Sequence, residues 1–171
     1  DSELAYNLPY VVEVEGHLDI NKLEDVFSKI IKRHETLRTS FEEVDGELVQ
    51  KVHSHIDFKI DTIHIQDGDK EEDIIKEFIR PFDLSKAPLI RVAVVKRNEN
   101  EYILMINMHH IISDGTSIGI LMKELSEFYK GRELDKLRVQ YKDYSAWQNN
   151  LFKDEKFKKQ EKYWIEKFKG E

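Results

Sequence analysis

Cysteine is absent from this sequence of 171 residues, which excludes disulfide bonds, thiolate metal ligands and a cysteine nucleophile. No apolar run in it approaches the roughly 20 residues that a membrane-spanning helix needs. Residues 1–4 have neither the basic region nor the apolar core of a signal peptide, and they lack an initiator methionine. We therefore expect a cytoplasmic chain that is cut from a longer protein and has no membrane partner.

Basic residues are fewer than acidic residues. The chain has 27 Lys and Arg residues against 34 Asp and Glu residues, which are interspersed and give a net charge of −7. Because such a charge disfavours binding to phosphate backbones, we expect no nucleic-acid partner. The glycine-rich motifs of dinucleotide-binding and P-loop proteins are missing too, which excludes the nucleotide-binding interpretation.

The apolar content is sufficient for one globular domain. Apolar residues make up 40% of the chain and aromatic residues 11%, and the length suits one domain with a real core. β-branched, alternating or continuous apolar runs predict about six extended segments. These segments are residues 8–16, 38–44, 47–53, 58–65, 89–97 and 101–109.

Turn residues and helical spacing complete the predicted architecture. Asp45-Gly46 and residues 98–100 join two pairs of these strands into hairpins. The first predicted helix begins after Asp19 or Asn21. Two further helices are predicted over 67–80 and 116–131, and a pair packed on the domain edge over 141–169. Strands and helices do not alternate strictly, so we expect an α/β fold with a mixed sheet covered by helices, rather than a Rossmann fold.

The segment 108–115 carries the most chemistry, because it joins an apolar strand to a helix. Side chains alternate along a strand, so His109 and His110 should face opposite ways, one into the interior and one into a cleft. This geometry counts against both histidines ligating one metal. Histidine is the side chain best suited to move a proton near neutral pH, since its ordinary pKa is about 6.5. We expect His110 to be the residue that does so.

The four residues after the histidine segment are expected to shape the loop. Asp114 and Gly115 are predicted to form a tight turn, and Thr116 or Ser117 can cap the helix that follows. A carboxylate at Asp114 can either orient an imidazole or hold the loop, and the residues alone do not choose between these roles.

Other interpretations of the same loop stay open. Both histidines can be structural residues at a strand end. His109, His110 and Asp114 can form a metal site, although their alternation disfavours it. A serine nucleophile, Ser113 or Ser117, is less favoured, because no Gly-x-Ser-x-Gly elbow surrounds either residue.

Three segments in order along the chain resemble condensation domains of nonribosomal peptide synthetases, the enzymes of peptide antibiotic biosynthesis. Residues 33–41 (RHETLRTSF) are similar to the second core motif of that family, 108–117 (MHHIISDGTS) to its third, HHxxxDG, and 141–147 (YKDYSAW) to its fourth. Residues 81–84 (PFDL) and 88–91 (PLIR) are also similar to the usual sequence of that family at these places. An HxxxD pattern alone would be weak, but the ordered set is specific and covers most of the chain.

The resemblance implies a chloramphenicol-acetyltransferase-like fold of two lobes, with a tunnel that two carrier-bound substrates enter from opposite ends. The amine of an acceptor aminoacyl thioester attacks a donor thioester, and His110 acts as base or positions the amine. Asp114 is implied to be structural and paired with an arginine, for which Arg38 is the candidate. His109 supports the turn, and Gly115 keeps the loop tight beside the substrate. No metal or directly bound cofactor is implied, because phosphopantetheine of the carrier domains holds the substrates.

The first motif and the fifth and later motifs of the family are missing, so the chain resembles an incomplete N-terminal lobe, spanning 1–171, that is expected to be inactive alone. Its expected partners are upstream and downstream peptidyl carrier domains, the missing C-terminal lobe and an adjacent adenylation domain. The form of the HHxxxDG segment favours the peptide-forming type.

Two rivals remain: another HxxxD acyltransferase that uses a coenzyme A thioester and an alcohol, and a non-catalytic module that docks carriers.

Three further features are interpreted as structural. Residues 33–35 are taken as a solvated helix end, and the lysine-rich segment 153–169 as a solvated face, with contact to acidic carriers as the alternative. His53, His55 and His64 are taken as exposed strand histidines rather than a metal site.

Overall fold

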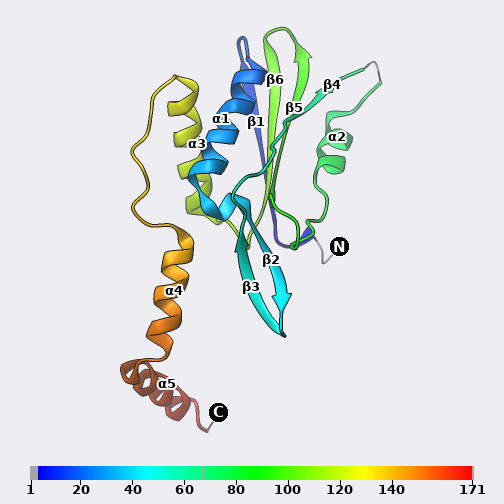
Figure 1. Ribbon diagram of the computed structural model, residues 1–171. Coiled ribbons are helices and arrows are strands. Elements are labelled where there is room, and N and C mark those ends of the chain that lie inside the picture. Colours follow the sequence, from blue (N-terminus) through cyan, green and yellow to red (C-terminus); the bar gives the residue numbers. More distant parts are fainter. Residues whose placement is uncertain (1–3, 67, 171) are drawn as a thin grey trace. The chain divides into compact units, whose positions relative to one another are not determined.

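The computed structural model describes residues 4–66 and 68–170 (Figure 1). The chain divides into two compact units, Asp1–Lys136 and Leu137–Glu171. The first unit contains both sheets and three α-helices, and the second contains α4 (Tyr141–Phe152) and α5 (Glu155–Lys167). Within the described residues no helix combines the length and apolarity needed to cross a membrane.

The main sheet of the first unit is mixed, as predicted. Its strands are β1 (Asn7–Glu15), β6 (Glu101–His109), β5 (Ile90–Asn98) and β4 (Asp61–His64), in that spatial order. β6 pairs antiparallel with both β1 and β5, whereas β4 pairs parallel with β5. β6 is therefore hydrogen-bonded along both of its edges.

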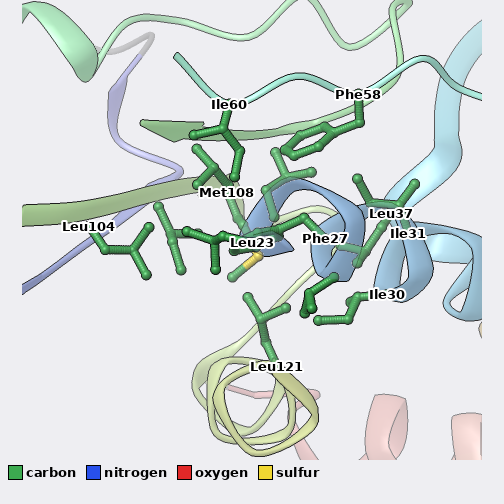
Figure 2. Close-up of a cluster of buried hydrophobic side chains, with 14 of the residues drawn as sticks. Leu23, Phe27, Ile30, Ile31, Leu37, Phe58, Ile60, Leu104, Met108 and Leu121 are labelled. Carbon is green, nitrogen blue, oxygen red and sulfur yellow. The ribbon is translucent and has the colours of Figure 1, made fainter. Parts of the chain in front are cut away.

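The β5–β6 hairpin is buried on both faces, as its continuous apolar sequence predicts. Even-numbered residues of β6, such as Leu104 and Met108, pack with the helices α1 (Ile20–Arg33) and α3 (Gly115–Tyr129) (Figure 2). Odd-numbered residues, Ile103 and Met105, pack on the other face with α2 (Glu71–Phe78) and its Phe78. The sheet thus lies between two apolar layers, with α1 and α3 on one face and α2 on the other.

Helix α1 (Ile20–Arg33) forms as its sequence predicts. The side chain of Asp19 caps it by accepting a hydrogen bond from the backbone N–H of Lys22 at 2.9 Å, which decides between the two candidate caps. Its buried residues are the five that the helical spacing selects, Leu23, Val26, Phe27, Ile30 and Ile31. This apolar face meets β5, β6 and α3 in the core shown in Figure 2.

The predicted Asp-Gly hairpin is also present, as a separate two-stranded sheet. β2 (Thr39–Val44) and β3 (Glu47–Val52) pair antiparallel about Asp45 and Gly46, which have φ angles of 54° and 81°. Positive φ at both central residues is typical of the type I′ turn that suits strand twist. The 3₁₀ helix η2 (Glu35–Arg38) precedes β2, so this strand begins one residue later than predicted.

Helix α2 is shorter than the predicted 67–80. Position 67 lies outside the described residues, and Gly68 has a φ angle of 100°, which a helix does not tolerate. The helix begins at Glu71. The three acidic residues of its first turn interact favourably with the positive end of the helix dipole.

The predicted pair of helices at the end of the chain forms, as α4 and α5 of the second unit, and its packing on the domain edge stays a prediction. No residue of α4 is buried, and the side chains of Trp147 and Trp164 are 57% and 56% exposed. The aromatic rings contact one another along each helix instead. Tyr144 lies 5.6 Å from Trp147 between ring centroids, and Tyr163 lies 5.3 Å from Trp164.

Truncating a large side chain of the central core is expected to destabilise the fold strongly. Phe27 has no exposed area and its ring lies 5.9 Å from that of Phe58 between centroids. We expect Phe27→Ala to lower the free energy of unfolding by about 3–5 kcal/mol, because the cavity it leaves cannot collapse fully. Urea denaturation followed by far-ultraviolet circular dichroism measures this. Leu48→Ala is the control, since Leu48 is 85% exposed and its loss should change little. Equal effects of the two variants would contradict the assignment of the core.

Candidate active site

The backbone of the two histidines is anchored to the strands on both sides of β6. His109 ends β6 and its N–H donates to the carbonyl of Leu89 at 3.0 Å, while the N–H of His110 donates to the carbonyl of Tyr6 at 2.7 Å. In the sheet register His109 also stands opposite Asn7 of β1. The place of both residues is therefore set by the central sheet.

The chain turns directly after these hydrogen bonds, at residues 110–112 rather than at the predicted Asp114-Gly115. The N–H of Ile112 donates to the carbonyl of His109 at 3.1 Å, and the hydroxyl of Ser113 donates to the same carbonyl at 3.0 Å. Ile112 and Ser113 are both buried. The turn is earlier than expected because the buried Ile112 and Ser113 draw the chain back into the core.

Asp114 is the N-cap of α3 (Gly115–Tyr129), so the predicted caps Thr116 and Ser117 are wrong. Its carboxylate accepts hydrogen bonds from the N–H of Ser117 at 2.8 Å and from the hydroxyl of Ser117 at 2.7 Å. That hydroxyl in turn accepts from the N–H of Asp114 at 3.1 Å, which completes a capping box. These hydrogen bonds, with a smaller effect from His110, hold the pKa of Asp114 below its ordinary value.

Gly115 is the first residue of α3 rather than part of a turn. A Cβ atom added there would meet no atom within 4 Å, so no contact inside the described chain requires glycine at this position. Its predicted closeness to a substrate stays a prediction.

His109 and His110 differ in exposure, as the alternation predicts. His109 is half-buried, with its ring centroid 6.2 Å from those of Tyr6 and Phe82, and the ring of Phe82 meets it edge-on. Its Nδ1 accepts a hydrogen bond from the N–H of Ile111 at 3.1 Å, which places the proton of the neutral ring on Nε2. Burial, and next the nearby charge of His110, lower the pKa of His109. These contacts and the lowered pKa favour a neutral ring for His109, and its role as a supporting residue stays a prediction.

His110 is exposed, at the start of the turn. Its charge influences both neighbours, since it lowers the pKa of His109 and contributes to lowering that of Asp114. Of the two histidines, it is the more exposed.

The expected pairing of Arg38 with Asp114 is wrong. The guanidinium of Arg38 donates from Nη1 to the carbonyl oxygen of His53, and its Nη2 lies 3.4 Å from Oε1 of Glu35. Arg38 is the last residue of η2, one turn after Glu35 and beside the end of β3, so both partners are local. Arg38 therefore braces η2 against the hairpin, while the carboxylate of Asp114 is engaged by its own helix.

The alternative chemistries find little support. Within residues 4–66 and 68–170, no group of three or more His, Asp or Glu side chains is placed to hold a metal ion. The hydroxyls of Ser113 and Ser117 donate to the carbonyl of His109 and to the carboxylate of Asp114, respectively. Neither serine is thus arranged as a nucleophile activated by His110.

The three other histidines that we considered have separate surroundings. Nε2 of His53 lies 2.8 Å from the hydroxyl of Ser40, and Nε2 of His55 lies 2.9 Å from a carboxylate oxygen of Asp57. His64 is exposed on β4. The interpretation as exposed histidines fits His55 and His64, whereas His53 is half-buried.

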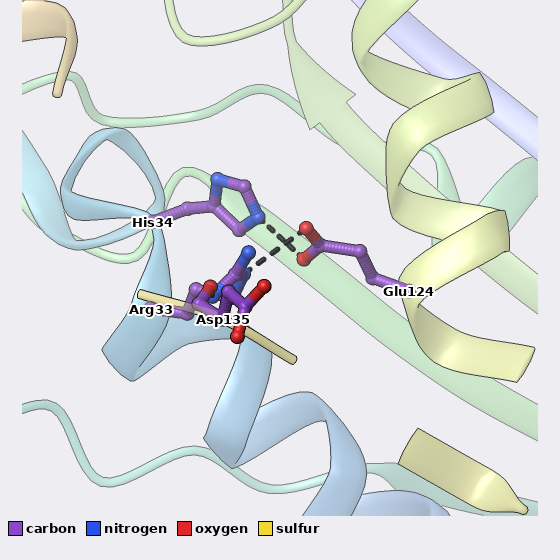
Figure 3. Close-up of polar contacts among 4 residues, drawn as sticks. All are labelled: Arg33, His34, Glu124 and Asp135. Carbon is purple, nitrogen blue, oxygen red and sulfur yellow. Dashed lines mark hydrogen bonds and ion pairs between the residues drawn. The ribbon is translucent and has the colours of Figure 1, made fainter. Parts of the chain in front are cut away.

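Glu124 is the functional-site candidate that the sequence interpretation missed. Its carboxylate contacts both Arg33 and His34, which were expected to be a solvated helix end (Figure 3). A signal was present, because Glu124 lies at helical spacing between the apolar residues Leu121 and Phe128 on one face of α3. A charged residue on an apolar face needs a partner, because an unpaired buried charge is costly.

The lowered pKa of His109 predicts a pH effect on stability. Its pKa in the folded state lies below the ordinary value of about 6.5 for an unfolded chain, so protons bind the unfolded state more tightly. The stabilising contribution is therefore lost as the pH falls below neutral. We expect His109→Phe, which keeps the ring contacts and cannot titrate, to lose less stability than wild type between pH 7 and pH 5. Urea denaturation across this range measures it, and parallel pH profiles of the two proteins would contradict the prediction.

The capping role of Asp114 predicts different effects of two substitutions. Asp114→Asn keeps an oxygen that can accept from the N–H of Ser117, whereas Asp114→Ala removes it. We expect the alanine variant to melt at a lower temperature than the asparagine variant, by thermal denaturation. If Asp114 acted chiefly as an ion-pair partner, the two variants would be equally destabilised, which would contradict the capping assignment.

Comparison with known proteins identifies the family of this chain. The family model described as "Condensation domain" matches residues 1–171. The chain is 49% identical over 168 residues to Gramicidin S synthase 2 of Aneurinibacillus migulanus, and 50% identical over 170 residues to Bacitracin synthase 3 of Bacillus licheniformis. These matches cover 98% and 99% of this chain, but only 4% and 3% of the two synthases.

Solved structures give the same result for the fold. The condensation domain of the Monacolin K polyketide synthase MokA matches with a TM-score of 0.81 and 22% identity, over 96% of this chain and 38% of that one. A structure of condensation-domain-mediated chain release from the enacyloxin polyketide synthase matches with a TM-score of 0.76 and 24% identity, over 99% and 35%. The expected chloramphenicol-acetyltransferase-like fold class is thereby confirmed. On the family model and its synthase relatives, this chain belongs to the condensation-domain family of the nonribosomal peptide synthetases.

Proposed function

We propose that this chain is the N-terminal lobe of a peptide-bond-forming condensation domain and that His110 handles the proton of the reaction. The observation that carries this is the exposed ring of His110 at the end of β6, a strand that is paired on both edges. Such a histidine is presented by a rigid support yet can reach a substrate. Its neighbour His109 is held inward and neutral by burial.

The proposed reaction joins two carrier-bound substrates. The nitrogen of the acceptor amine attacks the carbonyl carbon of the donor thioester, a C–N bond forms and the C–S bond breaks. The carrier thiol leaves, and the amine proton passes through His110 to the thiolate, so that charge and atoms balance. His110 either takes the proton as a base or orients the amine by accepting its hydrogen bond.

The capping of α3 supports His110 over the helix end as the reactive group. The first N–H groups of a helix can stabilise a developing negative charge. Here the carboxylate of Asp114 accepts hydrogen bonds from the N–H groups of Thr116 and Ser117, so these donors are already occupied. The loop therefore offers an imidazole rather than an anion site.

The proposed substrates and partners follow from the family. Two carrier domains would present their acyl groups on phosphopantetheine arms, an adenylation domain would load them, and a C-terminal lobe would complete the tunnel. The chain spans a small part of the synthases that it matches. We accordingly expect it to be inactive by itself and test the proposal in the intact parent enzyme.

The central prediction concerns His110→Ala in the intact parent with both carriers loaded. We expect dipeptidyl-carrier formation to slow by at least about 100-fold, because general acid–base groups contribute roughly 10²–10⁴-fold. Rapid quenching and mass spectrometry of the carriers measure the rate. His55→Ala is the matched control, since His55 is exposed and its ring pairs with the nearby Asp57.

Two outcomes would favour the rival functions. If the wild-type parent made no dipeptide and instead acylated an alcohol from a coenzyme A thioester, it would be a different HxxxD acyltransferase. If His110→Ala condensed its substrates at the wild-type rate, the loop would not be catalytic, and the docking module would be the better description.

A further inference from the structure

Glu124 is a nearly buried carboxylate in the middle of α3, and it links this helix to the end of α1. Its Oε1 lies 3.0 Å from Nε of Arg33, and its Oε2 lies 2.6 Å from Nε2 of His34. The side chains are 11%, 15% and 22% exposed for Glu124, Arg33 and His34. Because an ionised carboxylate only accepts, both nitrogen atoms donate to it. Figure 3 shows the two donors from α1 converging on this one residue of α3.

The same cluster holds the chain that follows α3. Arg33 donates from Nη1 to the backbone carbonyl of Asp135, in the segment after the helix (Figure 3). The cluster therefore fixes the C-terminal side of α3 to α1 through side chain and backbone together.

The hydrogen bonds of this cluster restrict the rotation of α3 about its own axis, which apolar packing alone restricts less. α1 and α3 also meet through apolar residues such as Ile30 and Leu121 (Figure 2). Apolar burial is non-directional, so it favours contact between two helices without fixing the rotation of one about its axis. Charge-assisted hydrogen bonds depend on distance and angle, so the two bonds to Glu124 select one rotation of α3.

The packing between this cluster and the histidine loop is incomplete. A cavity of about 90 Å³ lies there, and its lining includes His34 from the end of α1 and Ser113 and Ser117 from the loop and α3. Ile30 of α1 and Leu121 of α3 line the same cavity, and the two bonds to Glu124 add directional contacts between these helices.

The rotation of α3 is transmitted to the loop at its first residues. Ser117 of α3 and Asp114 of the loop are joined by the capping box, and Asp114 follows His110 by four residues. A helix moves as a rigid body, so a change in its rotation moves Asp114 and the turn that carries His110.

We propose that Glu124 is a positioning residue for the condensation reaction: by binding Arg33 and His34 it sets the rotation of α3, and hence the course of the turn that orients the ring of His110. This inference rests on the proposed function of the loop. It assigns Glu124 no contact with substrate.

The test compares two glutamates of α3 in the intact parent enzyme. Glu124→Gln keeps the shape but presents an amide N–H to one of the two donors, which breaks the paired arrangement. Glu127→Gln is the matched control, because Glu127 is also ion-paired, to Arg132 at 2.7 Å, but this partner lies just after α3 and not on α1. Single-turnover condensation with both carriers loaded gives a rate constant and an amplitude for each variant.

We expect the rate constant of Glu124→Gln to fall roughly tenfold, because misplacing a reactive group by a fraction of an ångström is costly. The amplitude of Glu124→Gln should match wild type. Both the amplitude and the rate constant of Glu127→Gln should match it as well. A merely structural role of Glu124 would lower the amplitude, which counts folded enzyme, and would leave the rate constant unchanged. Combining Glu124→Gln with Asp114→Ala should slow the reaction less than the product of the two single effects, since both act through α3.

The outcomes separate this inference from the function on which it rests. If the wild-type enzyme forms no dipeptide, the proposed function fails. If the wild type is active and Glu124→Gln has the rate constant of Glu127→Gln, only the positioning role fails. Should Glu124→Gln not fold, His34→Gln removes one of the two contacts and leaves Arg33 in place, and an unchanged rate constant for that variant would overturn the inference.

Discussion

The structure depends on one strand, β6, that is paired on both edges and buried on both faces. It hydrogen-bonds to β1 on one edge and to β5 on the other, and its side chains are buried alternately in two apolar layers. A slip of one residue would exchange these layers, so the register is strongly specified. Because β6 ends at His109, the buried strand determines where the exposed His110 emerges. The rigidity of the core and the exposure of the His110 ring are consequences of the same pairing.

Helix α3 supplies the second constraint, and it acts through polar contacts. At its start, Asp114 and Ser117 exchange hydrogen bonds in the capping box, which ties the loop to the helix. In its middle, Glu124 binds the two donors at the end of α1. Core and cap are thus complementary: the apolar layers hold the strand, and the hydrogen bonds hold the helix that completes the loop. Both are needed to place one imidazole.

Most of the fold could be predicted from the sequence, because its elements are locally specified. The helical spacing of α1 selects its buried face, and Asp45-Gly46 specifies the β2–β3 turn. The partners of charged residues could not be predicted, because they depend on which elements meet in space. Arg38 pairs with Glu35 and the carbonyl of His53 instead of Asp114.

The central claim is that β6 and α3 together present His110 to the amine that attacks. A crystal structure of the intact domain with an acceptor aminoacyl group on a non-hydrolysable phosphopantetheine analogue tests it most directly. The account predicts a ring nitrogen of His110 within hydrogen-bond distance of the acceptor amine, with Asp114 still accepting from Ser117. An acceptor amine held by other residues, with the ring of His110 remote from it, would contradict the account.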